Sequence, residues 1–344
     1  MNFLRKILYP FSLLYGEITS TRNTFYDKGI LKSTQFDIPT IVVGNLSVGG
    51  TGKTPQVEYL VRLLQKTHKL AILSRGYKRS TKGFIIANST STANQIGDEP
   101  LQYFKKFSNV IIAVDADRVN GIEQLTQLLD KPDIILLDDA FQHRKVDAGL
   151  NVLLTSYNDL YIDDHMLPTG NLREKVSGAE RAKIIVVTKC PTALSQQEQF
   201  EITKKLHVET HQTAFFSTIK YGNEIIGKSD SIAISKLAEY KVVLVTGIAK
   251  TEPLINFLKE KNIAVQHIKY TDHYNFSDKD IEKINSTFNA IETDKKIVLT
   301  TEKDYVRSFT TSNLEVYYLP IETSFIEHQE DFNRIITDYV EQSS

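Results

Sequence analysis

A run of eight residues near the start of the chain has the composition of a phosphate-binding loop. Glycines let backbone N–H groups turn inward around phosphate oxygens, a lysine can meet the β- and γ-phosphates, and a hydroxyl can ligate magnesium. We therefore predict nucleotide binding by Ser47, Val48, Gly49, Gly50, Thr51, Gly52, Lys53 and Thr54. The run departs from the pattern G-x-x-x-x-G-K-[ST] at its first position, where Ser47 replaces glycine.

Two adjacent carboxylates end another apolar run. Asp138 and Asp139 follow the apolar residues 134–137. Enzymes with a phosphate-binding loop hold Mg²⁺ with the loop hydroxyl and an acidic residue at the end of a neighbouring strand. We therefore predict a magnesium site formed by Thr54 and one or both of Asp138 and Asp139, and the sequence does not choose between the two carboxylates.

Further polar residues follow other apolar runs. Arg75 and Arg118 each come directly after or close behind such a run, and Gln142 and His143 follow the carboxylate pair. Arginines beside a phosphate loop are well placed to stabilise a transferring phosphoryl group or to bind a phosphate-bearing substrate. Asp98 lies in the run Gly-Asp-Glu-Pro at a predicted helix start, where capping is its simplest role.

These polar residues require strands to position them. Continuous apolar runs, typical of strands covered on both faces, predict strands at residues 40–43, 70–73, 110–114, 134–137, 152–154 and 184–187. Helical patterns such as residues 57–64 lie between them. The alternation predicts an α/β fold with a mostly parallel sheet of the P-loop NTPase type and helices on both faces. The polar residues would then meet at the carboxyl edge of the sheet.

The composition changes between residues 214 and 230. The segments 214–219 and 224–226 flank a Tyr-Gly-Asn sequence and predict a hairpin that links two domains. Apolar runs resume afterwards and predict strands at residues 242–245, 297–299 and 316–319. We expect an N-terminal helical segment, a P-loop domain, a hairpin linker and a smaller α/β domain that closes over the site, at residues 1–36, 37–213, 214–230 and 231–344.

The N-terminal segment has apolar residues at helical spacing. They are Leu4, Ile7, Leu8, Phe11, Leu14, Tyr15 and Ile18, with Arg5 and Lys6 among them. A signal peptide fits poorly, because a continuous apolar region and a small-residue cleavage site are missing. Two interpretations stay open: an amphipathic helix packed on the protein's own core, or a helix that lies in a membrane interface.

Charge and motif content disfavour some classes of protein. The net charge of −1 argues against a general nucleic-acid binder, so we expect no nucleic-acid partner. The run Thr188-Lys189-Cys190-Pro191 has the lysine of the guanine motif N-K-x-D without its aspartate, which disfavours a GTPase. Cys190 is the single cysteine, so no internal disulfide can form, and a reducing compartment fits.

Several of these motifs together resemble the tetraacyldisaccharide 4'-kinases of lipid A biosynthesis. The resemblance covers residues 43–55, 73–77, 97–100, 117–118, 137–144, 167–174, 272–274 and 301–304, in order along nearly the whole chain. The phosphate loop without its first glycine and the run Asp-Asp-Ala-Phe-Gln-His are its specific features. Ala140 and Lys175 depart from the family, which frequently has glycine and proline at these positions.

The resemblance implies transfer of the γ-phosphate of ATP to the 4'-hydroxyl of a tetraacylated glucosamine disaccharide 1-phosphate, which gives lipid IVA. It implies that Asp98 and His273 act at this hydroxyl, and that Arg173 and Glu174 belong to the substrate or phosphate site. It also implies a peripheral enzyme on the cytoplasmic face of the inner membrane, held by its N-terminal helix.

Two other functions remain as alternatives. One is a P-loop ATP-dependent ligase or soluble small-molecule kinase, which would have no use for the apolar N-terminus. The other is a nucleotide-switch protein whose output is a binding partner, which would not need a histidine to activate a hydroxyl.

Overall fold

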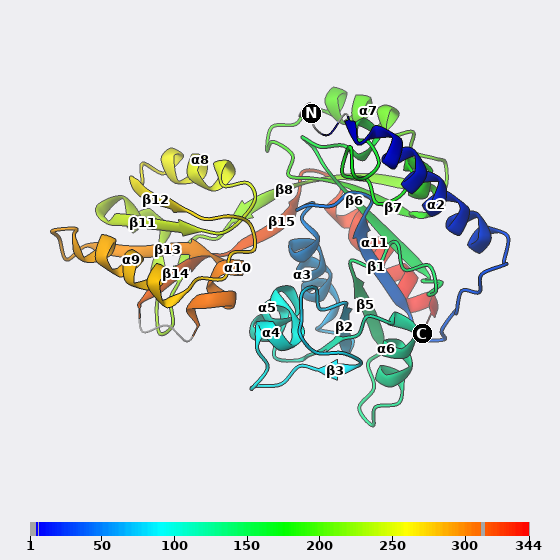
Figure 1. The fold of residues 1–344 in the computed structure, drawn as a ribbon, viewed down its shortest axis with the longest axis horizontal. Helices are drawn as coiled ribbons and strands as arrows, with labels where there is room; N and C mark the ends of the chain where they lie inside the picture. Colours follow the sequence, from blue (N-terminus) through cyan, green and yellow to red (C-terminus); the bar gives the residue numbers. More distant parts are fainter. Residues whose placement is uncertain (1–4, 6, 311–313, 344) are drawn as a thin grey trace. The chain divides into compact units, whose positions relative to one another are not determined.

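The computed structural model describes residue 5 and residues 7–310 and 314–343 of the 344-residue chain. Leu4 and Lys6, which belong to the predicted N-terminal pattern, lie outside the described residues. The chain forms two compact units, the first made of residues 1–219 and 323–344 and the second of residues 220–322. The expectation of an α/β fold is confirmed in both (Figure 1).

The first unit is built on a nine-stranded sheet with the order β15-β8-β7-β6-β1-β5-β2-β4-β3. Adjacent strands from β8 to β4 run parallel, and β3 pairs antiparallel with β4. Its strands are β1 (Thr40–Asn45), β2 (Leu70–Ser74), β3 (Ile85–Ile86), β4 (Val110–Val114), β5 (Ile134–Asp138), β6 (Leu150–Ser156), β7 (Ile184–Thr188), β8 (Thr213–Tyr221) and β15 (Ile321–Phe325). Each strand predicted before residue 190 is present.

Helices cover both faces of this sheet, as side-chain alternation in a strand requires. Ile41 and Val43 of β1 pack in a core with helices α3 and α11, whereas Val42 packs in the opposite core with helix α6. The helices of the unit are α2 (Tyr9–Asp27), α3 (Lys53–Leu64), α4 (Ala93–Ile96), α5 (Asp98–Lys106), α6 (Arg118–Thr126), α7 (Gln196–Lys205) and α11 (Gln329–Ser343). Short 3₁₀ segments occur at Tyr161–Asp163 and Val176–Arg181.

The second unit has a six-stranded sheet with the order β10-β9-β14-β13-β11-β12. Its strands are β9 (Glu224–Ile226), β10 (Ser231–Ala233), β11 (Lys241–Thr246), β12 (Val265–Lys269), β13 (Lys296–Thr301) and β14 (Val316–Leu319). Its helical segments are Ile234–Glu239, α8 (Glu252–Glu260), α9 (Asp278–Asn289), α10 (Glu302–Asp304) and the π-helical Tyr305–Phe309. Val242 and Leu244 pack with α8, and Val243 and Val245 pack with α9, so this sheet is also covered on both faces.

Two expectations about the domain boundary need correction. β8 and β9 do not form a hairpin, because β8 pairs in the large sheet and β9 in the small one. The chain therefore leaves the first unit along β8. The second unit also ends at Glu322 and does not continue to residue 344. The C-terminal helix α11 belongs to the first unit, because Phe332, Ile336 and Val340 complete a core that also contains α3.

Helix α2 packs on the first unit with its small polar face and leaves its apolar face exposed. Ser12, Gly16 and Thr19 are its buried residues. Its large apolar side chains are exposed instead, among them Tyr9, Phe11, Leu13, Leu14, Ile18 and Phe25, as are Ile7 and Leu8 just before the helix. The interpretation in which the apolar face packs on the protein's own core is therefore wrong for the described residues. Within these residues, no helix is both long and apolar enough to cross a membrane.

Candidate active site

The phosphate loop connects β1 to α3, as its sequence predicts. Gly52 precedes the helix with a φ of +83°, a conformation that glycine adopts without strain, so that the chain can turn into α3. Two side chains from the end of β7 hold the outer side of the loop. Thr188 Oγ1 donates a hydrogen bond to the carbonyl of Thr51 over 2.8 Å, and Lys189 Nζ donates to the carbonyl of Gly50. The N–H groups of Val48 and Thr51 already donate to the carbonyls of Asn171 and Gly49. The other N–H groups of the loop are left for phosphate oxygens.

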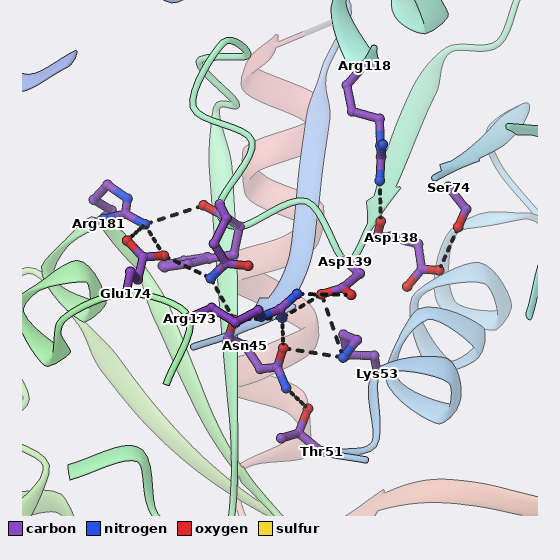
Figure 2. Close-up of polar contacts among 12 residues, drawn as sticks. Asn45, Thr51, Lys53, Ser74, Arg118, Asp138, Asp139, Arg173, Glu174 and Arg181 are labelled. Atoms are coloured by element: carbon purple, nitrogen blue, oxygen red, sulfur yellow. Dashed lines mark hydrogen bonds and ion pairs between the residues drawn. The ribbon is translucent and has the colours of Figure 1, made fainter. Parts of the chain in front are cut away.

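Lys53 lies at the centre of a polar cluster (Figure 2). Its Nζ is 3.6 Å from Asp139 Oδ1 and 3.3 Å from Asn45 Oδ1. Asn45 Nδ2 in turn donates to Thr51 Oγ1 over 2.8 Å. Sequence reasoning missed Asn45, although its place as the last residue of the strand before the loop is visible in the sequence. The cluster places one cation where the phosphates of a nucleotide would lie.

Arg173 connects the same cluster to a distant segment. Its guanidinium contacts both carboxylate oxygens of Asp139, at 2.8 and 3.2 Å, and also hydrogen-bonds to Asn45. A bidentate arginine–carboxylate pair has a fixed geometry. Arg173 therefore orients Asp139, and it places a second positive charge beside Lys53.

The two adjacent aspartates differ in direction and surroundings. Asp138 is buried and accepts a hydrogen bond from Ser74 Oγ over 3.2 Å. Asp139 has a φ of +49°, which is unusual for a non-glycine residue and turns its carboxylate towards Lys53 and Arg173. The two carboxylates thus lie in different environments, because the backbone at Asp139 is left-handed.

Electrostatics separates the two carboxylates further. Burial raises the pKa of Asp138 to about 7, and the charges of Asp139 and Glu99 raise it in the same direction. Burial also acts to raise the pKa of Asp139, but the positive charges of Lys53 and Arg173 outweigh it, and the net shift is downward. Asp139 is therefore anionic at neutral pH. Asp138 is poised to lose its proton when a positive charge approaches.

Glu174 and Gln142 support this cluster from behind. Glu174 is fully buried, and it accepts hydrogen bonds from Arg181 at 2.9 Å and from Gln142 Nε2 at 2.8 Å. Gln142 Nε2 also donates to the carbonyl of Asn45 over 2.9 Å. Arg181 was not predicted as a site residue, because in the sequence it is a single basic residue outside any motif. These contacts hold the strand end and the 173–174 segment together.

Arg118 and His143 have contacts that leave them little access to a ligand. Arg118 is 2% exposed, and it donates to the carbonyls of Asp115, Ala116 and Asp138. His143 Nε2 is 3.3 Å from the backbone N–H of Arg118, the first residue of α6. Burial and the neighbouring Arg118 lower the pKa of His143 to about 4, so its ring is neutral at pH 7. Arg118 thus ties the ends of β4 and β5 together.

Arg75 differs from Arg118, because it is exposed. It forms no hydrogen bond or ion pair with any residue that the structure describes. Its charge nevertheless contributes to the lowered pKa values of Arg118 and His143, so it lies near them. Arg75 is therefore a cation at the edge of the site with its guanidinium available to a phosphate group.

Asp98 is the first residue of α5 and is half-buried. Its position depends on a close backbone approach between two loops. Gly97 has a φ of +96°, and a Cβ there would lie 3.1 Å from Gly76 Cα, whereas one on Gly76 would lie 2.8 Å from the carbonyl oxygen of Ile96. Only glycine fits both places. The loop that carries Arg75 is thus packed directly on the loop that carries Asp98.

His273 belongs to the second unit. Its φ is +57°, and its backbone N–H donates to the carbonyl of Gly247 over 3.1 Å. Its Nε2 lies 3.3 Å from Lys303 Nζ and 4.0 Å from Asp272. Asp304, fully buried, accepts from the N–H of Gly247 over 2.8 Å. The motifs at 272–274 and 301–304 therefore meet within this unit, which places His273 in a defined loop. Its pairing with Asp98 of the first unit stays a prediction.

The oxygen donors beside the loop suit a hard divalent cation. In the part of the chain that the structure describes, no group of three or more His, Cys, Asp or Glu side chains forms a metal site by itself. Mg²⁺ does not need such a group, since it binds through one or two carboxylates, nucleotide phosphates and water. The buried carboxylate of Asp138 is a donor of this kind.

A phosphate loop with its lysine, a strand-end carboxylate pair and a bidentate arginine, on a parallel sheet with helices on both faces, define an enzyme of the P-loop kinase class. The profile of the LpxK family, tetraacyldisaccharide-1-P 4'-kinase, matches residues 4–341 of this chain. The chain belongs to this family.

Individual relatives carry the name of the same family. A tetraacyldisaccharide 4'-kinase of Flavobacterium johnsoniae is 53% identical over 344 residues, which cover 100% of this chain and 99% of the relative. The enzyme of that name in Bacteroides thetaiotaomicron is 42% identical and covers 99% of this chain, which spans 94% of the relative. The crystal structure of LpxK from Aquifex aeolicus in complex with ATP has a TM-score of 0.79 and 32% identity, with 98% of this chain and 100% of that chain covered. The chain is accordingly an ATP-binding lipid A 4'-kinase.

Proposed function

We propose that this enzyme phosphorylates the 4'-hydroxyl of tetraacyldisaccharide 1-phosphate with ATP and Mg²⁺ at a membrane surface, on the cytoplasmic face of the inner membrane. The observation that carries the proposal is the cluster of Lys53, Asn45, Asp139 and Arg173 at the phosphate loop. It supplies two positive charges and one oriented carboxylate at the place where a γ-phosphate would be transferred.

Phosphoryl transfer needs positioning and charge stabilisation more than covalent chemistry. In the proposed complex, the loop amides from Ser47 to Thr54, apart from those of Val48 and Thr51, bind the α- and β-phosphates. Lys53 leaves its contact with Asp139 to meet the β- and γ-phosphates. Arg173 and the exposed Arg75 face the developing negative charge or the acceptor's own phosphate.

The cation site is proposed at Thr54 and Asp138, with Asp139 beside it. A bound Mg²⁺ would supply neutralisation of the phosphate charge. Two observations support the proposal. Asp138 is buried, and its pKa of about 7 leaves it ready to ionise beside a cation. Lys53 is paired with the other carboxylate, that of Asp139.

The acceptor hydroxyl is a weak nucleophile at neutral pH, and a positioned base helps its attack. We assign this role to Asp98 together with His273. Asp98 starts α5 beside the Arg75 loop, and the ring of His273 is half-buried next to Lys303. Asp98 belongs to the first unit and His273 to the second.

The membrane part of the proposal is supported by helix α2. Its exposed face carries Phe11, Leu14 and Ile18, which are 62%, 61% and 60% exposed. A helix with such a face and with basic residues near its end suits the boundary between headgroups and acyl chains. A soluble kinase or ligase would have no use for this face, and neither it nor a nucleotide switch agrees with the family to which the chain belongs.

Incubation of the purified protein with γ-labelled ATP, Mg²⁺ and the disaccharide 1-phosphate in detergent micelles tests the function. A labelled lipid product is expected, and its loss on chelation of divalent cations would support the cation site. Release of labelled inorganic phosphate without a lipid product would favour a nucleotide switch. Titration of Asp138→Asn and Asp139→Asn against Mg²⁺ should give unequal responses, with the larger shift for Asp138→Asn.

A further inference from the structure

The inner face of helix α2 is specific in its chemistry. Ser12, Gly16, Thr19 and Asn23 follow one another at intervals of three or four residues and so form one stripe along the helix. Ser12 and Thr19 are buried and Asn23 is half-buried. Small polar residues pack by hydrogen bonds at fixed positions, whereas an apolar stripe would tolerate sliding. The helix therefore packs at a defined position on the first unit.

Several partners of α2 lie in one short segment, residues 169–175, and others are Gln142 and Arg144. Ser12 Oγ and Thr169 Oγ1 are 2.7 Å apart, and Tyr15 Oη donates to the carbonyl of Arg173 over 3.1 Å. Further along the helix, Asn23 Nδ2 donates to Glu174 Oε2 over 2.7 Å. The block that carries two predicted site residues is thus the surface on which the helix lies.

The same segment lies against the phosphate loop on its other side. The N–H of Val48 donates to the carbonyl of Asn171 over 2.8 Å, and the N–H of Arg173 donates to the carbonyl of Leu46 over 2.7 Å. The Arg173 guanidinium then contacts Asn45 and Asp139 (Figure 2). Segment 169–175 is therefore bonded to α2 on one side and to the residues around Lys53 on the other.

Glu174 is the point at which these contacts converge. It is a fully buried carboxylate with hydrogen bonds from Asn23, Gln142 and Arg181. A buried charge is costly to leave without partners, so its position follows theirs closely. Asn23 is the one of the three that comes from α2, and Gln142 also holds the carbonyl of Asn45. A displacement of Asn23 is thus transmitted to both contacts of Lys53, to Asn45 through Gln142 and to Asp139 through the neighbouring Arg173.

We propose that Asn23 is a positioning residue for phosphoryl transfer. Its hydrogen bond to Glu174 fixes segment 169–175, and the segment fixes Arg173 against Asp139 and Asn45. The helix proposed to lie in the membrane and the phosphate loop therefore act as one rigid assembly. This inference rests on the proposed kinase function, and it assigns to α2 a role in turnover that is separate from membrane attachment.

Asn23→Ala tests the inference, with Thr21→Ala as the matched control on the same helix. Thr21 is exposed, and its side chain has no hydrogen bond to any described residue. Activity is measured in detergent micelles, where attachment to a bilayer is not needed. We expect Asn23→Ala to lower kcat about tenfold, since small misplacements of phosphate-orienting groups are costly. The KM for ATP should change less than about threefold, co-sedimentation with liposomes should persist, and Thr21→Ala should behave as the wild type.

A double variant separates positioning from general loss of stability. Arg173→Lys keeps the charge but loses the bidentate geometry, and residual turnover is expected. If Asn23 acts through Arg173, the double variant should be little slower than Arg173→Lys alone, at a temperature well below every unfolding midpoint. Multiplicative losses, or a kcat of Asn23→Ala within about twofold of Thr21→Ala, would overturn the inference. A wild-type protein without lipid product would instead refute the proposed function.

Discussion

At the scale of single residues, the site contains pairs of side chains of the same type that differ in burial and in contacts. Asp138 and Asp139 are adjacent in sequence, yet the first is buried against Ser74 and the second is paired with two cations. Arg75 and Arg118 similarly follow neighbouring strands, and only Arg75 is exposed. Residue type alone therefore does not distinguish a ligand-binding side chain from a supporting one.

Lys53→Ala should abolish phosphoryl transfer while the protein stays folded. The lysine lies at the end of the phosphate loop, and its side chain, in contact with Asp139 and Asn45, is partly exposed. We expect kcat to fall by at least about a hundredfold, because an interaction with the transferring phosphate is lost. Circular dichroism and the unfolding midpoint should stay near wild-type values. Near-normal turnover by a folded variant would contradict the phosphate-loop assignment.

Asp138→Asn should stabilise the ligand-free protein at alkaline pH. The pKa of Asp138 is raised from 3.8 to about 7, so the folded state holds its proton more tightly than the unfolded state. The stability that this proton contributes is complete below pH 4 and is lost as the pH rises towards and through 7. Asparagine cannot ionise, and the variant should gain on the order of 4 kcal/mol at pH 8, with a gain of less than half of that at pH 5.

Denaturant unfolding at both pH values, in the presence of a metal chelator, measures this effect. Asp139→Asn is the matched control and should lose stability at pH 8, because the pKa of Asp139 is lowered and its charge is paired with Lys53 and Arg173. An equal loss in both variants at pH 8 would show that the charge of Asp138 is not costly in the folded protein.

At the scale of elements, helix α2 has two faces with different uses. Its inner stripe is polar and bonded to segment 169–175, and its outer face is large and apolar. Deleting the helix would remove both at once. Substitution on one face separates attachment to a membrane from support of the site.

The variant with Phe11, Leu14 and Ile18 all replaced by serine should lose binding to anionic liposomes. Each exposed side chain contributes roughly 1.5–3 kcal/mol when it is fully buried in an apolar phase, so the loss should exceed about tenfold in the partition coefficient. Co-sedimentation measures it, and the unfolding midpoint should hardly change since these side chains are exposed. If the wild-type protein itself stays in the supernatant, the interfacial helix has to be abandoned.

At the scale of the whole molecule, the two units divide the assigned roles. The first unit carries the phosphate loop, the carboxylate pair and Asp98, and the second carries His273. The chain leaves the first unit along β8 and returns to it at the end of β15. Two strands therefore link the units, so the second unit is an insertion in the first.

Asp98→Ala and His273→Ala should each lower kcat far more than they raise the KM for ATP. Both residues are assigned to the acceptor hydroxyl, not to the nucleotide. Because two residues that act as one unit give non-additive losses, the double variant should be little slower than the more damaged single variant. Steady-state kinetics with varied ATP tests this. Fully multiplicative losses would show that Asp98 and His273 act independently.

The sequence by itself determined the features that depend on short-range order. The phosphate loop, the carboxylate pair and the buried strands before residue 190 are encoded by residue types within a few positions, and the structure has them where they were predicted. Continuous apolar runs predicted a sheet covered on both faces, because a strand with one exposed face would alternate. The family resemblance followed from motifs of the same local kind.

Only the tertiary structure decided which polar residues meet. Asn45 and Arg173 are 128 positions apart, and Asn23 and Glu174 are 151 apart, so no local pattern predicts their contacts. The same holds for the burial of Arg118, the return of residues 323–344 to the first unit and the outward direction of the apolar face of α2. Helical periodicity shows that a face is apolar. Whether that face is covered depends on what the rest of the chain places against it.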